Sequence, residues 1–196
     1  MIYAAEKFDF PKLPFVFIRH GETDANRAGI IAGSNEPPLN DTGRAQAVAI
    51  APLMAMAKWH AVYVSPQDRA RMTASLVLPD YDAKVLDGLR ERHWGDLEGR
   101  PISELCPRFD TPPNGEGFDA MCQRVSFAMQ QALSEVSDDL TVIVAHSGVA
   151  RCILYMTGFE ADGPRVPNAT PILFRPTDTG WEYENLTESL IKEISG

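Results

Sequence analysis

The feature that most constrains the fold is an apolar run that ends abruptly on a cation, an imidazole and a glycine. The run Phe15-Val16-Phe17-Ile18 predicts a strand buried on both faces, and Arg19, His20 and Gly21 follow at once. In open α/β sheets, ligands bind just beyond the carboxyl ends of the strands, where a glycine lets the backbone turn sharply. Arg19 offers a planar fork suited to phosphate, and the ring of His20 can act as a nucleophile or carry protons. We therefore predict an α/β protein with an anion site at this point.

A second strand further along the chain ends in the same way. The run Thr141-Val142-Ile143-Val144-Ala145 is followed by His146, Ser147 and Gly148. If both strands are parallel and buried, their two histidines face one crevice. This pairing predicts that His20 and His146 belong to one site.

A third strand leads into the helix that carries the second candidate arginine. Ala61 to Val64 read as a short strand, and Ser65-Pro66 predicts a helix that starts with a serine cap and a proline. That helix extends to about Leu78 and places Arg69 in its first turn, where free N–H groups favour anions. Arg71 points to another face and is predicted to be a solvated charge.

The rest of the chain completes an alternation of strands and helices. We predict a helix from Asn40 or Thr42 to about Lys58, interrupted by Pro52. Further predicted elements are an edge strand at Val85–Leu86, a loop over 100–117, an amphipathic helix from Phe118 to Val136, and strands at Thr170–Arg175 and Trp181–Tyr183. The prediction is a single domain over 1–196, with 1–13 and 187–196 peripheral.

Net charge, apolar runs and cysteine spacing limit the partners, the location and the metal sites that we expect for this chain. The formal net charge of -9 argues against binding to nucleic acid or to an anionic membrane, so an anionic ligand must be attracted by a local cluster of arginines. No apolar run has the length of a membrane span, and residues 1–14 lack the apolar core of a signal peptide, which predicts a cytoplasmic protein. Cys106, Cys122 and Cys152 have no metal-site spacing and are predicted to be reduced thiols, two of them in the core.

Arg19-His20-Gly21-Glu22-Thr23 resembles the signature of the histidine phosphatase superfamily, also called the phosphoglycerate mutase-like family. Three further segments resemble that family's motifs in the family's order: Ser65 to Ala74, Leu89 to Gly99, and His146-Ser147-Gly148. The resemblance covers roughly residues 14–185. It implies a three-layer α/β/α sandwich with a mainly parallel central sheet.

The resemblance also implies a role for each matched residue. His20 becomes phosphorylated, His146 assists the phosphate oxygens, and Glu91 donates a proton to the leaving group. The implied phosphate-binding residues are Arg19, Asn26, Arg69 and Ser147. From the residues themselves, Glu98 is expected to be structural, and a packed, hydrogen-bonded histidine is one interpretation of His93. No metal and no cofactor are implied, because arginines occupy the place of a cation.

The resemblance leaves three functions to weigh. Ser147 stands where the acid phosphatase and phytase branch carries aspartate, which disfavours that branch. We predict a metal-independent hydrolase of a small phosphomonoester, since the segment after Gly99 offers only Arg100 and Arg108 for the basic lid of a mutase. The alternatives are a cofactor-dependent phosphoglycerate mutase and a catalytically silent phosphate-binding protein. The substrate, the oligomeric state and the roles of Pro52, Arg92, His93 and Arg151 stay open.

Overall fold

The computed structural model describes residues 7–135, 137 and 139–194, and it contains a central six-stranded sheet. The strand order is β3-β2-β4-β1-β5-β6. β1 pairs in parallel with β4, β4 with β2, and β2 with β3, whereas β5 and β6 are antiparallel. The strand bounds are Phe15–Arg19 (β1), Val62–Val64 (β2), Lys84–Val85 (β3), Thr141–Ala145 (β4), Pro171–Thr177 (β5) and Gly180–Asn185 (β6).

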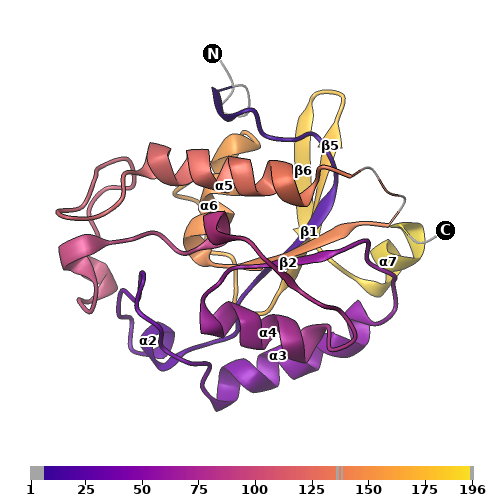
Figure 1. The fold of residues 1–196 in the computed structure, drawn as a ribbon, viewed down its shortest axis with the longest axis horizontal. Coiled ribbons are helices and arrows are strands. Elements are labelled where there is room, and N and C mark those ends of the chain that lie inside the picture. Colours follow the sequence, from indigo (N-terminus) through magenta and orange to yellow (C-terminus); the bar gives the residue numbers. More distant parts are fainter. Residues whose placement is uncertain (1–6, 136, 138, 195–196) are drawn as a thin grey trace.

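Helices cover both faces of this sheet and form the predicted three layers (Figure 1). α5 and α6 lie on one face, and α3 and α4 lie on the other, where α7 also packs. The helix bounds are Asp24–Arg27 (α2), Asp41–Met54 (α3), Asp68–Val77 (α4), Phe118–Ala132 (α5), Ser147–Met156 (α6) and Glu188–Ile194 (α7), with single 3-10 turns at Asp87–Leu89, Gly95–Leu97 and Ile102–Glu104. The predicted fold class is confirmed.

β1 and β4 lie at the centre of the sheet because their side chains are apolar on both faces. Phe15 and Phe17 point into the core beneath α5 and α6, whereas Val16 and Ile18 point into the core beneath α3 and α4. Successive side chains of a strand alternate between faces, so a continuous apolar run can fill two cores at once. The predicted bounds of β4 are confirmed, and β1 extends one residue beyond the predicted run, to Arg19.

Three helices differ from their predicted bounds, and one of them, α5, ends at Ala132 although the predicted helix extends to Val136. α3 starts after Asn40, whose side chain caps the helix by accepting from the backbone N–H of Gly43, but it ends at Met54, well before Lys58. Pro52 lies inside the last turn of α3, where a proline cannot donate its helical hydrogen bond. α4 starts at Asp68, so the Ser65-Pro66 helix start was wrong.

The ends of the domain are less peripheral than predicted. Phe8 and Phe10 are buried in the core beneath α5, and Ile191 of α7 is buried in the opposite core. Apolar side chains spaced along otherwise polar segments can anchor those segments by burial. Residues 1–6 and 195–196, and Val136 of the predicted helix, lie outside the described residues.

Cys122 and Cys152 are buried and Cys106 is half-buried, all three as free thiols, as predicted. Within the described ranges, no helix combines the length and apolar character needed to cross a membrane.

Candidate active site

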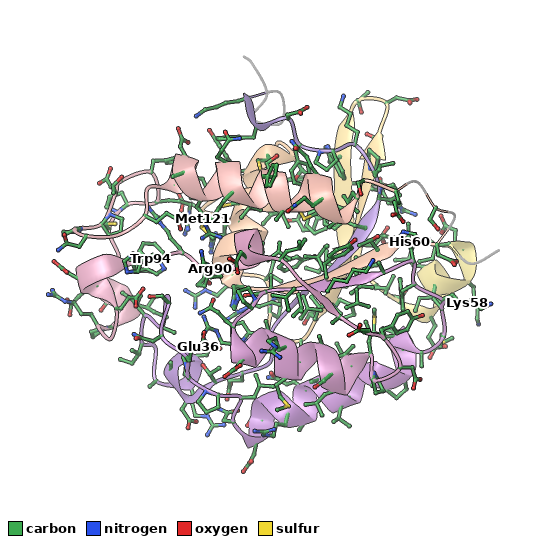
Figure 2. All side chains as sticks on the ribbon, viewed as in Figure 1. Glu36, Lys58, His60, Arg90, Trp94 and Met121 are labelled. Carbon is green, nitrogen blue, oxygen red and sulfur yellow. The ribbon has the colours of Figure 1, made fainter. Side chains whose placement is uncertain are left out.

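The carboxyl ends of β1, β2 and β4 meet at one edge of the sheet, and a cavity opens there. It is lined by residues from six segments of the chain: Arg19, His20, Asn26, Ile30, Ile31, Ala32, Gly33, Arg69, Glu91, Trp94, Ile102, Leu105, Arg108, Ser147, Gly148, Arg151 and Arg165. Trp94 and Glu36 lie at this end of the molecule, whereas Lys58 and His60 lie at the opposite end (Figure 2). The cavity therefore brings together most of the predicted site residues and excludes His60.

His20 presents one free ring nitrogen to the cavity. Its Nδ1 lies 2.7 Å from the carbonyl oxygen of Gly21, which can only accept, so Nδ1 carries the ring proton and Nε2 keeps its lone pair. Burial, together with the positive charges of Arg69 and Arg19, lowers the pKa of His20 well below its ordinary value. His20 is therefore a neutral imidazole at pH 7, with Nε2 available as a nucleophile.

A close contact between two glycines sets the turn after His20. A Cβ on Gly21 would lie 2.4 Å from the carbonyl oxygen of Gly43 at the start of α3. The N–H of Gly21 also donates to the hydroxyl of Thr73 on α4 at 3.0 Å. Because the loop is packed from two sides, the carbonyl that holds His20 has a fixed position.

Arg19 and Arg69 are the two buried cations beside His20. Arg19 donates through Nη1 to the carbonyl oxygen of Val166 at 2.8 Å, and its buried Nε has no hydrogen-bond partner among the described residues. Arg69 donates to the carbonyl oxygens of Gly33 and Asn35 at 2.9 and 2.7 Å. Burial lowers the pKa of Arg19 to about 10, and the charge of Arg165 adds to this effect, but both arginines stay charged at neutral pH.

His146 lies against His20, with ring centroids 5.1 Å apart, but it does not line the cavity itself. Its Nε2 lies 2.7 Å from the hydroxyl of Ser65, and its buried Nδ1 has no hydrogen-bond partner among the described residues. Ser65 accepts from the N–H of Gln67, so the Ser65 hydroxyl hydrogen is free to point to Nε2. Burial and the charge of Arg69 lower the pKa of His146 well below its ordinary value. The ring is neutral, and the Ser65 hydroxyl can either donate to Nε2 or accept from it.

Glu91 is fixed at the cavity wall by contacts from three segments. The N–H of Glu91 donates to the Gln67 side chain at 2.8 Å, and its carboxylate accepts from the N–H groups of Arg92 and Gly148 at 2.8 and 3.1 Å. A Cβ on Gly148 would lie 2.0 Å from Oε1 of Glu91, so only glycine lets the carboxylate reach the start of α6.

Asn26 and Ser147 also line the cavity, and Glu98 has the structural role that the sequence indicates. The carboxylate of Glu98 accepts from the backbone N–H groups of Ser34 and Trp94. His93, whose role was open, is exposed, which does not fit the interpretation of a packed histidine; its backbone carbonyl accepts from the N–H of Glu116.

Two arginines whose roles were open organise the loops around the cavity. Arg92 is buried and donates to the carbonyl oxygens of Arg108, Asp110 and Glu116, which ties the loop before α5 to the Glu91 segment. Arg151 lines the cavity and donates to the carbonyl oxygens of Ala161 and Gly163.

Sequence reasoning missed Gln67, Arg165 and Asn168. Asn168 donates to the carbonyl oxygen of His20 at 2.8 Å, and Arg165 lines the cavity. The sequence around 160–168 carries no motif, because these residues reach the site only through long-range packing. For Gln67 the sequence offered one signal, namely a side chain able to form hydrogen bonds between Pro66 and the predicted phosphate-binding Arg69. Across the described ranges, no three His, Cys, Asp or Glu side chains are grouped so that they could hold a metal ion.

Comparison with known proteins places the chain among phosphoryl-transfer enzymes. The family model of the histidine phosphatase superfamily (branch 1) matches residues 15–189. A metal-independent phosphoserine phosphatase from Arabidopsis thaliana is 30% identical over 191 residues, which cover 88% of this chain and 80% of that protein. The solved structure of an alpha-ribazole phosphatase from Shigella flexneri superposes with a TM-score of 0.75 at 26% identity, over 90% of this chain and 97% of the other. A phosphoglycerate mutase from Thermus thermophilus gives a TM-score of 0.69 at 29% identity, over 89% and 97% of the two chains.

Proposed function

This chain belongs to the histidine phosphatase superfamily, and from that premise we propose that it hydrolyses small phosphomonoesters through a phosphohistidine on His20. The observation that carries the proposal is the state of the His20 ring. Its Nδ1 proton is held by the Gly21 carbonyl, so an unprotonated Nε2 lies in a cavity that Arg19 and Arg69 also line. A neutral imidazole between two cations is suited to attack phosphorus in an anionic ester.

In the first step, Nε2 of His20 forms a bond to phosphorus as the bond to the ester oxygen breaks. Arg19 and Arg69 stabilise charge on the equatorial oxygens, and the unpartnered Nε of Arg19 supplies a further donor. The neutral ring of His146 packs against His20 and assists the same group. Glu91 gives its proton to the departing alkoxide.

In the second step, a water molecule forms a bond to phosphorus and the bond between nitrogen and phosphorus breaks. Glu91 takes the proton of that water and returns to its starting state. No metal has a part in this scheme, because Arg19 and Arg69 supply the positive charge. The name of the Arabidopsis relative, a metal-independent phosphatase, agrees with this.

Hydrolysis is favoured over mutase activity by the composition of the loop before α5. Of the two arginines in this loop, only Arg108 lines the cavity, whereas Arg100 pairs with Glu104 at the surface. A mutase must shield its phosphohistidine from water, which requires a more extensive cover. Phosphoglycerate mutase stays the second candidate, since a mutase is among the structural neighbours.

Trapping the intermediate tests the mechanism. Rapid quenching without acid during turnover of p-nitrophenyl phosphate should leave a phosphoryl group on His20, and His20→Ala should abolish it. Turnover should survive exhaustive EDTA treatment. Full activity of His20→Ala with label on another residue, or rescue of chelated enzyme by a metal, would refute the proposal.

The Glu91→Gln variant tests the general acid and separates the two activities. The amide keeps the shape of the side chain but has no proton to give, so alkyl esters should lose about 100-fold in kcat while p-nitrophenyl phosphate, with its good leaving group, loses far less. With 3-phosphoglycerate and a bisphosphoglycerate primer, the wild type should release phosphate faster than it forms the 2-isomer. Fast isomer exchange with little phosphate release would make the protein a mutase.

A further inference from the structure

The arginines of the cavity fall into an inner and an outer group. Arg19 and Arg69 are the charges that lower the pKa of His20, which places them beside the nucleophile. Arg108, Arg151 and Arg165 line the same cavity but are less buried: Arg108 and Arg151 are half-buried and Arg165 is exposed, whereas Arg19 and Arg69 are buried. These three arginines, the outer group, therefore lie closer to the surface than Arg19 and Arg69.

This outer group gathers positive charge in a chain whose net charge is -9. Its members come from three segments: the loop before α5, the helix α6, and the loop that precedes β5. Like charges repel, and the charges of Arg108 and Arg165 both contribute to lowering the pKa of Arg151. A phosphate dianion bound between Arg19 and Arg69 would leave the outer cations without a ligand.

Two of the three outer arginines have hydrogen-bond donors without a partner among the described residues. Arg108 uses only Nε, which donates to the carboxylate of Asp162 at 2.7 Å, so both of its Nη groups have no partner among the described residues. Arg165 makes no hydrogen bond and no ion pair within the described ranges. Arg151, in contrast, donates through Nη1 to two backbone carbonyls, those of Ala161 and Gly163, and so holds the loop that precedes β5 in place. Asp162 is two-thirds exposed and does not line the cavity, whereas Arg108 does.

We propose that the substrate carries a second anionic group, a carboxylate or a second phosphate, on its leaving-group side, and that Arg108 and Arg165 bind it. This rests on the proposed phosphatase function and names its substrate class. A guanidinium with two free Nη groups can bind either anion through paired hydrogen bonds. The apolar side chains of Trp94, Ile102 and Leu105 line the same cavity and suit the carbon skeleton between the two anions.

The neighbouring cavity on the other side of Glu91 is less suited to this group. It is lined by Arg90, His93 and Arg124, but also by Glu36 and Glu116. The guanidinium of Arg124 is already paired with Glu116 at 2.6 Å. An anion there would meet carboxylates as well as cations.

Matched pairs of esters test the proposal. O-Phosphoserine and O-phosphoethanolamine differ by one carboxylate, and 1,3-propanediol bisphosphate and its monophosphate differ by one phosphate. We expect the member with the second anion to have the lower KM in at least one pair, and the pair that shows it identifies the anion. In Arg108→Gln and Arg165→Gln, the KM of that member should rise about tenfold or more, while its partner changes less than about threefold.

Three control variants separate binding from loop structure. Asp162→Asn removes the partner of Arg108 but keeps the arginine, so it should retain the preference; an equal loss in Asp162→Asn would assign the effect to loop position and overturn the proposal. Arg100→Gln removes a surface cation from the same loop and should change nothing. Loss of the preference in Arg90→Gln alone would place the second anion in the neighbouring cavity, which also overturns it.

The failures of the two proposals are distinguishable. If the wild type hydrolyses no phosphomonoester, the proposed function fails. If it hydrolyses p-nitrophenyl phosphate and both members of each pair with the same KM, the phosphatase function stands and the second-anion site is refuted.

Discussion

The two strand–histidine segments of this protein share a sequence pattern but differ in how the ring is held. After β1, His20 is followed by a loop packed against Gly43, and its Nδ1 is bound by a carbonyl that leaves Nε2 facing the cavity. After β4, His146 directly precedes α6, its Nε2 is bound by Ser65, and Nδ1 is the nitrogen left over. A carbonyl can only accept, so it assigns the ring proton of His20 to Nδ1, whereas the Ser65 hydroxyl can donate to Nε2 of His146 or accept from it. The shared sequence pattern therefore places both histidines, but the ring of His20 is held by the next residue in the chain and the ring of His146 by a residue 81 positions away.

The strongest test of this difference compares His20→Gln with His146→Gln. Loss of the nucleophile should lower kcat by about 10⁴-fold or more, because no other group can accept the phosphoryl. Loss of His146 should cost only about 10²- to 10³-fold, as for a single donor to a developing charge. Steady-state rates on p-nitrophenyl phosphate give the comparison, and thermal melts confirm that both variants fold. Equal losses, or a larger loss at His146, would contradict the assignment of roles.

Ser65→Ala should reduce the difference between the two histidines, because it removes the hydrogen-bond partner of the His146 ring. Without the hydroxyl, Nε2 loses its partner and the ring is held less firmly against His20, so kcat should fall about tenfold, the equivalent of one hydrogen bond. Nitrogen chemical shifts of the two rings should change at His146 and stay the same at His20.

A suitable control is Ser126→Ala, which removes another buried serine whose hydroxyl bonds to the carbonyl of Phe8, far from the site. It should leave kcat unchanged. If both serine variants lose the same activity, the effect belongs to the core and not to His146.

The smallest expected effect concerns stability at low pH. Both histidines are buried and have lowered pKa values, so below the unfolded pKa of about 6.5 the unfolded chain binds protons that the folded chain does not. The free energy of unfolding should therefore fall with falling pH, by about 1 kcal/mol per histidine between pH 6.5 and 5.5. Urea titrations of wild type and of the two glutamine variants measure it: each variant should lose one histidine's share. An unchanged pH dependence in both would show that neither ring is held neutral.

The sequence predicted the parts of this site that depend on local patterns. The apolar runs before His20 and His146 identified the two central strands, because a buried strand can be recognised from a few consecutive apolar residues. Family motifs then identified Arg69 and Glu91 as residues of the same cavity, and the cavity contains both.

Features that depend on distant contacts could not be predicted. The helix start at Ser65-Pro66 was wrong because the Ser65 hydroxyl is used by His146, a residue 81 positions away. The burial of Ile191 and the exposure of His93 likewise depend on which surfaces meet in three dimensions. Gln67 and Arg165 contact or adjoin site residues that are distant in the sequence, so no short stretch of sequence around either residue indicates its place in the site.

The strand order has a consequence for how the enzyme is made in the cell. β4 lies between β2 and β1, so residue 15 pairs with residue 141, and β1 and β2 are not neighbours. A nascent chain that has not yet reached residue 141 already contains His20, Arg69 and Glu91, but it lacks the strand that joins their supports into one sheet. Such long-range pairing is slow to form and follows synthesis of the later segments. We therefore expect the growing polypeptide to carry these residues through most of translation without an assembled cavity, and we expect the cavity to form only once the segment from residue 141 onward has been synthesised.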